Sequence, residues 1–166
     1  MKSIFYCLAI YLILVHAAQA NVATSRTTFK GLITVATCNI VVGDDAQTVD
    51  MGEISSTELE TRGRSRSVPF TIRLYGCSES DKIAKTLFDQ TGTGASGTVI
   101  PVDGMTGVGL SLQDGGGNPI TFNSYSIGQK IQEGNNALHF SVFLVKTGQI
   151  QAGRFSRVLH YSIKYE

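Results

Sequence analysis

Short segments in which apolar and polar residues alternate cover most of the chain. In the segment 68–75, Val68, Phe70, Ile72 and Leu74 fall on one face, and the segment 138–144 has the same alternation. A period of two is typical of strands that bury one face. Clusters of Gly, Asn and Asp separate the segments, as in an all-β sandwich. The expected strands cover residues 28–42, 48–54, 68–76, 82–90, 97–102, 108–113, 120–122, 138–146 and 153–165.

The last expected strand, 153–165, carries the longest alternation. Its polar face contrasts with an apolar face that is interrupted only by Arg157. A segment patterned this well near a terminus is expected to be held in a sheet rather than to fray. Arg157 is expected either to reach out to the edge of the face or to mark a bulge. The apolar face consists of Gly153, Phe155, Leu159, Tyr161, Ile163 and Tyr165.

Residues 1–20 are expected to be a secretory signal peptide. Lys2 precedes an apolar run at 4–15, and Ala18-Gln19-Ala20 provides a cleavage site before Asn21. The alternative is a membrane anchor, but about a dozen apolar residues fall short of the roughly 20 that span a bilayer. We therefore expect an exported chain that begins at Asn21.

Composition narrows the class of protein further. The chain has 14 basic and 13 acidic residues, which balance once Lys2 is removed, so nothing favours a nucleic acid or an anionic membrane as partner. Removal of Cys7 leaves Cys38 and Cys77, and a single disulfide is the default for two cysteines in an exported chain. No histidine stands at the spacing of a zinc site.

Three motifs resemble functional signatures, and each is better interpreted as structural. Residues 92–97 match G-x-G-x-x-G, but the strand-like segment 98–101 follows where a dinucleotide site needs a helix. The basic cluster 62–66 lacks interleaved aromatic residues and is interpreted as a solvated loop. His139 and His160 lie on polar faces with no catalytic neighbour at motif spacing. We expect neither enzymatic activity nor a cofactor, although an enzyme site assembled only in space would leave no such signature.

Several fragments occur in a fixed order along the chain, and together they form a specific pattern. This pattern resembles the pilin subunits of bacterial chaperone–usher fimbriae, most closely a type 1-like minor subunit. In that family a Gly is fourteenth from the C-terminus and a Tyr is penultimate, as Gly153 and Tyr165 are here. The fragments are Phe29-Lys30-Gly31-x-Ile33 before Cys38, Val49-x-Met51-Gly52-x-Ile54, Pro69-Phe70-x-Ile72-x-Leu74 before Cys77, Val108-Gly109-Leu110-x-Leu112, Leu138-His139-Phe140, and Ala152-Gly153.

The resemblance implies an incomplete immunoglobulin-like sandwich that lacks its seventh strand. A periplasmic chaperone would cover the open groove, and at the outer-membrane usher the N-terminal arm of the next subunit would replace it, since a donated strand pairs the free edge. Growth would be head-to-tail. The chain would then divide into a signal peptide (1–20), a donor-strand extension (21–33) and a pilin domain (34–166), and its product would be a fimbrium on the cell surface.

The resemblance also assigns residues. In the arm, Thr27, Phe29, Gly31 and Ile33 would enter the neighbouring subunit, with polar Thr27 predicting a weaker donor. The groove and the chaperone contact would be formed by Gly153, Phe155, Leu159, Tyr161, Ile163, Tyr165 and Glu166, the last through the C-terminal carboxylate. The expected function is a structural subunit that contributes to cell adhesion, and its partners are other subunits, chaperone, usher and a host receptor met by the assembled fimbria. The alternative is an adhesive module whose surface loops bind host glycan or protein.

Overall fold

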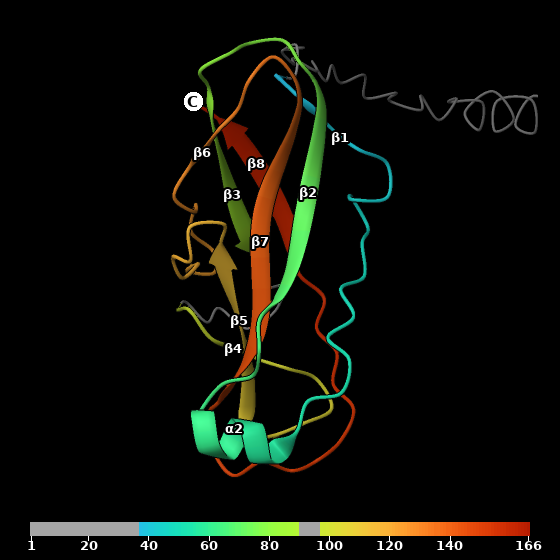
Figure 1. Cartoon of the computed structure of the whole chain (residues 1–166), viewed down its shortest axis with the longest axis vertical. Helices are drawn as coiled ribbons and strands as arrows, with labels where there is room; N and C mark the ends of the chain where they lie inside the picture. Colours follow the sequence, from blue (N-terminus) through green and yellow to red (C-terminus); the bar gives the residue numbers. More distant parts are fainter. Residues whose placement is uncertain (1–36, 90–96) are drawn as a thin grey trace, which may run out of the picture. The chain divides into compact units, whose positions relative to one another are not determined.

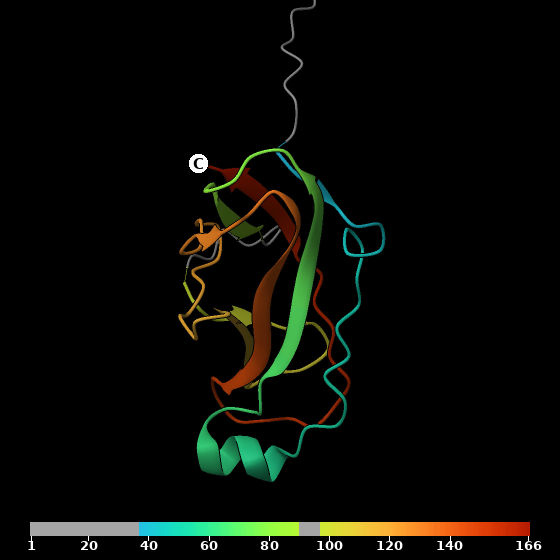
Figure 2. The same cartoon turned by 45° about the horizontal axis from the view of Figure 1, so that its top comes forward.

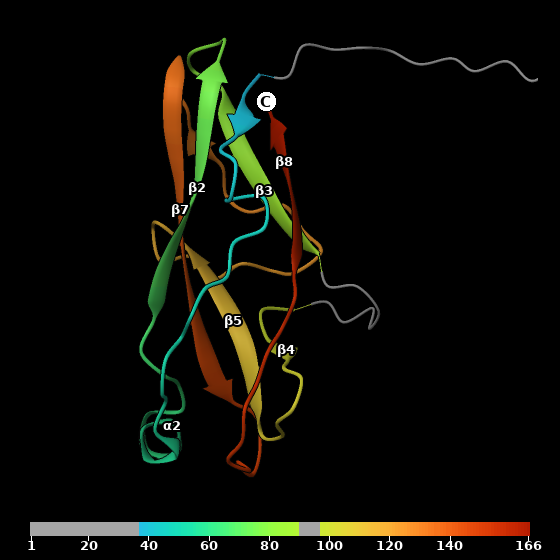
Figure 3. The ribbon, with the colours of Figure 1, turned by 90° about the vertical axis from the view of Figure 1, so that its right-hand side faces the viewer.

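Two antiparallel sheets make up the fold in the computed structural model, which describes residues 37–89 and 97–166 (Figure 1). The larger sheet has the order β1-β2-β7-β5-β4 and the smaller one β6-β3-β8. Figure 3 shows β2 and β7 on one side and β3 and β8 on the other. The elements are β1 (Asn39–Ile40), α2 (Ser56–Arg62), β2 (Val68–Cys77), β3 (Ile83–Asp89), β4 (Ile100–Pro101), β5 (Val108–Asp114), β6 (Gln129–Lys130), β7 (Gly134–Lys146) and β8 (His160–Tyr165).

The pairing of β2 with β7 forms the centre of the larger sheet. Ile72 lies opposite Leu138, and their exposed fractions are 0% and 1%. Alternate residues on both strands point to the same side, so the faces expected from the sequence are confirmed. Phe88 of β3 lies across the core from Phe140, with ring centroids 5.2 Å apart in an edge-to-face arrangement. The core is therefore the layer between the two sheets.

Four of the expected strands correspond to β2, β3, β5 and β7 apart from their ends. The prediction was wrong for 48–54 and 120–122, which form no strand, and too long for 97–102, which holds only β4. Met51, Ile120 and Phe122 are nevertheless buried in these segments. The spacing of apolar residues therefore predicted correctly which side chains are buried. It did not predict strands correctly, because a residue can be buried without lying in a paired strand. Of 28–42, the described part contains only the two-residue β1.

The last expected strand is also shorter than the sequence predicted. Only His160–Tyr165 pairs continuously, and the preceding residues make one isolated bridge, between Ser156 and Asp103. The alternation of faces still holds, because Phe155, Arg157 and Leu159 are half-buried while the residues between them are exposed. The segment is thus extended without a full ladder beside it, which alternation alone cannot distinguish from a strand.

The short helix α2 was not expected, because its seven residues, Ser56–Arg62, contain one apolar side chain, Leu59, which is buried. The helix ends at Gly63, whose φ of 72° suits glycine and whose N–H donates to the carbonyl of Leu59 at 2.9 Å. One apolar residue in two turns gives no helical period to read. Within residues 37–166, the helix lies at the opposite end of the fold from the C-terminus (Figure 2).

Ile72→Ala is expected to lower the free energy of unfolding by about 2–5 kcal/mol, because it removes a fully buried side chain from the β2–β7 core. Urea denaturation of the two chains measures the difference. Asn135→Ala, an exposed position on β7, serves as the control and should change this free energy by less than about 0.5 kcal/mol. Equal effects of the two substitutions would contradict the assignment of Ile72 to the core.

Candidate strand-acceptor site

The strand β8 lies at the edge of the smaller sheet. Its residues pair with β3, from Asp89 opposite His160 to Ala84 opposite Tyr165. Among the described residues, no strand pairs with its other edge. The backbone N–H and C=O groups along a free edge are a template for a further strand.

A row of partly covered apolar side chains accompanies this free edge. The residues pack against the core on one side, yet each remains half-exposed, unlike the fully buried residues of β7. The structure therefore brings the positions expected for the groove and the chaperone contact onto one face, except Gly153 and Glu166, which are exposed. The row consists of Phe155, Leu159, Tyr161, Ile163 and Tyr165.

A second free edge lies next to β8. The strand β1 pairs only with β2 within the described residues, and Ile40, Val49 and Ile54 on and after it are also half-buried against the core. The hydroxyl of Tyr161 on β8 donates to the carbonyl of Asp44, just beyond β1, at 2.8 Å. Figure 3 shows β1 and β8 side by side near the C-terminus. The two sheets thus present their free edges to the same side.

Asp44 holds the turn after β1 in place. Its buried carboxylate accepts hydrogen bonds from Arg73 of β2: from Nε at 2.9 Å, from Nη2 at 2.7 Å and from the backbone N–H at 2.7 Å. The guanidinium hydrogen bonds, followed by that of the backbone, lower the pKa of Asp44 below its ordinary value. Their stabilisation is therefore present above that ordinary pKa and is lost as the pH falls through the lowered one.

Sequence reasoning missed this cluster. Gly43-Asp44-Asp45 has the composition of a turn, but no local signal links Asp44 to Arg73, 29 positions later. Tyr161 was expected only as an apolar wall residue. Burial, followed by the charge of Asp44, raises the pKa of Tyr161, so its phenol stays protonated and able to donate.

Arg157 lies inside the apolar row rather than at its margin. Its side chain is 10% exposed, and Nη1 lies 3.5 Å from Oδ1 of Asp103. The neighbouring backbone supports this ion pair, because Ser156 and Asp103 exchange two hydrogen bonds. Burial alternates without a break from Phe155 to Ile163, so no bulge turns the segment over at Arg157.

Glu166 fastens the end of β8 to β3. Its backbone exchanges hydrogen bonds with Ile83, and its carboxylate pairs with Lys85 at 2.5 Å and also with Lys164. The hydrogen bond from Lys164, followed by the one from Lys85, lowers the pKa of Glu166 to about 2. Because the carboxylate is exposed, solvent screens these ion pairs, and the backbone bonds are the firmer link.

The disulfide expected from the cysteine count is confirmed. Cys38 and Cys77 are bonded and buried, and the bond joins the residue just before β1 to the end of β2. With a sequence separation of 39, the chain-entropy model gives a stabilisation of roughly 4 kcal/mol. The bond fixes the edge strand β1 to the sheet, which its two ladder pairs alone would do weakly.

The expected donor residues Thr27, Phe29, Gly31 and Ile33 lie outside the described residues, as do the signal segment 1–20 and the glycine-rich motif at 92–96. Their roles stay predictions.

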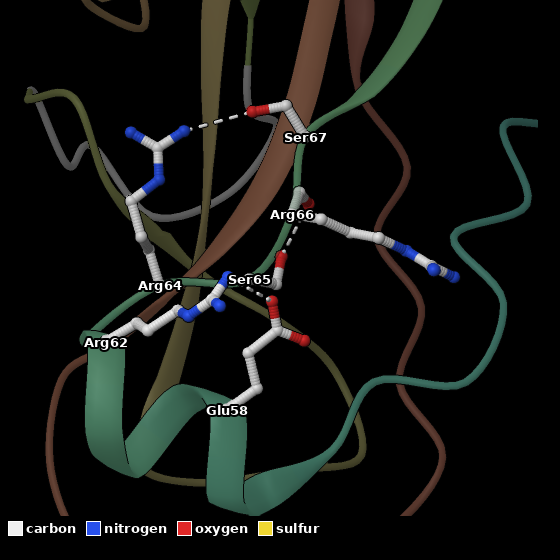
Figure 4. A pocket seen from close by; sticks show the side chains of 6 residues that line it. All are labelled: Glu58, Arg62, Arg64, Ser65, Arg66 and Ser67. Atoms are coloured by element: carbon white, nitrogen blue, oxygen red, sulfur yellow. Dashed lines mark hydrogen bonds and ion pairs between the residues drawn. The ribbon is translucent and has the colours of Figure 1, made fainter.

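The basic cluster after α2 lies beside a cavity of about 370 Å³ (Figure 4). The three arginine side chains are exposed, as expected for a solvated loop, but the backbone is not free: buried Ser65 exchanges hydrogen bonds with Leu144. The guanidinium of Arg64 lies 4.0 Å above the ring of Phe143, and Arg62 pairs with Glu58. In Figure 4, the side chain of Arg66 points away from that of Arg64. The cations therefore do not converge on one ligand.

The histidines considered as catalytic candidates do not form an assembled site in the described part of the chain. His139 and His160 are exposed on their strands. No three His, Cys, Asp or Glu side chains within 37–89 and 97–166 gather where they could hold a metal ion. No helix of the same residues has the length and apolar character needed to cross a membrane.

Known proteins resemble the chain over most of its length. The family model for fimbrial protein matches residues 27–166. Fimbria A protein of Serratia marcescens is 30% identical over 155 residues, which cover 90% of this chain and 89% of that protein. The Major MR/P fimbria protein of Proteus mirabilis (strain HI4320) is 31% identical over 157 residues, with the same shares covered.

Solved structures share the fold. The crystal structure of the P pilus rod subunit PapA superposes with a TM-score of 0.70 at 23% identity, and covers 79% of this chain and 100% of its own. A chaperone–usher pilus structure gives the same TM-score at 22% identity, over 90% of this chain and 100% of its own. The expected fold, an immunoglobulin-like sandwich one strand short, is confirmed. The chain therefore belongs to the fimbrial protein family, the non-enzymatic structural subunits of fimbriae on the bacterial surface.

Proposed function

We propose that this chain is a fimbrial subunit whose β8 edge receives the N-terminal arm of the next copy. The observation that carries the proposal is the free edge of β8 beside a row of half-exposed apolar side chains. A free edge and an uncovered apolar face together form an aggregation hazard unless another chain covers them. A single added strand removes both problems, because its backbone pairs with the edge and its alternate side chains cover the row.

Burial gives an estimate of the gain. Complete burial of a large apolar side chain contributes about 1.5–3 kcal/mol, and these side chains are already mostly covered, so the exposed remainder is worth roughly 0.5 kcal/mol for each residue. Burial of that remainder on Phe155, Leu159, Tyr161, Ile163 and Tyr165 would together contribute about 2–3 kcal/mol, besides the backbone hydrogen bonds of β8. This is a large fraction of the about 5–15 kcal/mol by which a folded domain is usually stable. The subunit would therefore depend on its neighbour to be stable.

The arm that we assign to this role is the segment 21–33, with Thr27, Phe29, Gly31 and Ile33 as its inserted residues. Before assembly, a periplasmic chaperone would lend a strand to the same edge and contact Gly153 and Glu166, and the exchange would take place at an outer-membrane usher. Residues 1–20 would be removed on export, and residues 34–166, which follow the arm, would form the pilin domain. A minor-subunit role stays a prediction, because the named relatives include a major fimbrial protein.

A self-complemented version of the chain is expected to be monomeric and far more heat-resistant than the parent. In it, residues 21–35 follow Glu166 through a short flexible linker, so that the arm reaches the β8 edge of its own molecule. The parent chain, expressed alone in an oxidising compartment, should aggregate or unfold at a lower temperature. Calorimetry and size-exclusion chromatography measure the two properties.

The matched control carries the same appended segment with Phe29→Asp and Ile33→Asp, which keeps its length but removes two apolar side chains from the arm. This control should behave like the parent chain. If it is as stable as the self-complemented version, or if the parent is already as stable, the missing-strand proposal fails.

Tyr165→Asp is expected to reduce incorporation into fimbriae at least about tenfold, because the charge would enter the apolar row at the end of β8. Ser162→Asp places the same charge on the exposed face of β8 and should leave incorporation unchanged. Quantitative immunoblotting of sheared surface fimbriae, compared with the periplasmic pool, measures the ratio. Equal losses for both variants would show that any charge on β8 interferes and would contradict the assigned face.

A further inference from the structure

We propose that Asp44, Arg73 and Tyr161 form an edge clamp that sets the separation of the two free edges before a donated strand arrives. They would act as positioning residues for strand capture. The proposal rests on the proposed function, because it takes the strand to be received beside β8. It gives a role to Asp44, to Arg73 and to the hydroxyl of Tyr161, whose hydrogen bonds the apolar row does not explain.

The first part of the clamp is the turn after β1. Val41 donates its N–H to the carbonyl of Arg73 at 2.9 Å, and Asp44 donates its own to the carbonyl of Val41 at 3.0 Å. The turn is thus closed on itself and attached to β2 at Arg73. It continues the pairing of β1 with β2 past the end of the ladder.

The second part is the Asp44–Arg73 pair. The side chain of Asp44 is 8% exposed and that of Arg73 is 59% exposed, so the carboxylate is the inner member of the pair. It accepts two hydrogen bonds from the guanidinium and one from the backbone of the same residue. Three donors from one residue fix the carboxylate in position and direction, which also fixes the carbonyl of Asp44.

The third part is Tyr161, which connects the two sheets. Its hydroxyl donates to the carbonyl of Asp44 at 2.8 Å, and its ring lies 6.1 Å from the ring of Phe88 in the core. One end of the side chain is held by the turn of the larger sheet and the other by the smaller sheet. Tyr161 therefore acts as a spacer between the free edges of β1 and β8.

A fixed spacing matters because strand capture loses conformational entropy for every segment of the acceptor that is mobile beforehand. If the edges are already held apart at the width of one strand, less conformational freedom is lost on capture. If the clamp is broken, the edges would close over the apolar row or separate, and both changes slow capture. We expect the effect on the rate at which a strand enters, since Tyr161→Phe keeps the aromatic ring in the row and Asp44→Asn leaves the whole row unchanged.

The chain offers two matched controls. Asp50 lies outside the turn of Asp44, is exposed, and accepts a hydrogen bond from the N–H of Gly52 at 2.8 Å. Tyr75 lies on β2 and is 46% exposed, and its hydroxyl makes no hydrogen bond within the described residues. Asp50→Asn and Tyr75→Phe make the same chemical changes as Asp44→Asn and Tyr161→Phe at positions outside the clamp.

The test measures how fast the mature chain, purified in complex with its periplasmic chaperone, captures a fluorescent peptide of residues 21–35. Tyr161→Phe and Asp44→Asn are each expected to slow capture about three- to tenfold, the effect of losing one or two hydrogen bonds. Because both act through one contact, the double variant should be about as slow as the slower single variant. The two controls should stay within about twofold of the parent rate.

Parent rates in both clamp variants would overturn the proposal, and so would losses that multiply in the double variant, since separate structural effects add in free energy. Equal slowing by the controls would overturn it as well. Should Asp44→Asn fail to form the chaperone complex, Tyr161→Phe decides alone, because it removes one hydroxyl and keeps the ring. A parent chain that captures no peptide refutes the proposed function itself, and the clamp with it.

Discussion

The free edge of β8 is the constraint on which the rest of the structure depends. A backbone edge needs hydrogen-bond partners, and an apolar face needs cover, yet the described chain supplies β8 with a neighbour on one side only. Every feature around it keeps that edge ordered in the absence of the second neighbour. Glu166 ties its end to Ile83, and Ser156 ties the segment before it to Asp103.

The free edge of β1 is held in place by different contacts. The strand β1 is only two residues long, too short to be secured by its ladder. The Cys38–Cys77 disulfide fixes it on one side and the Asp44–Arg73 pair fixes the turn on the other. Covalent and ionic links thus replace the packing that a complete sandwich would provide. A structure that must leave one face open is expected to rely on such links, since it cannot bury that face itself.

The sequence predicted the faces well and the pairing less well. Phe70, Ile72 and Leu138 point inward as their alternation requires, because burial on one face imposes a period of two. The same alternation at 153–159 predicted a strand, but a strand also needs a neighbour, which sequence spacing does not report. The helix α2 was missed because one apolar residue, Leu59, gives no period. The Asp44–Arg73 pair was missed because it joins residues far apart in the chain.

Arg157 shows why an open face need not be purely apolar. A charge inside a closed core would need its full desolvation cost repaid by one partner, but the row beside β8 keeps some contact with water. There Asp103 provides a counter-ion, and the long stem of Arg157 covers apolar surface. In the proposed assembly, the arriving strand would cover this ion pair and raise the cost of an imperfect fit at that position. The residue opposite Arg157 would then have to leave the pair with Asp103 intact, so a polar or small side chain is favoured there over a bulky aliphatic one.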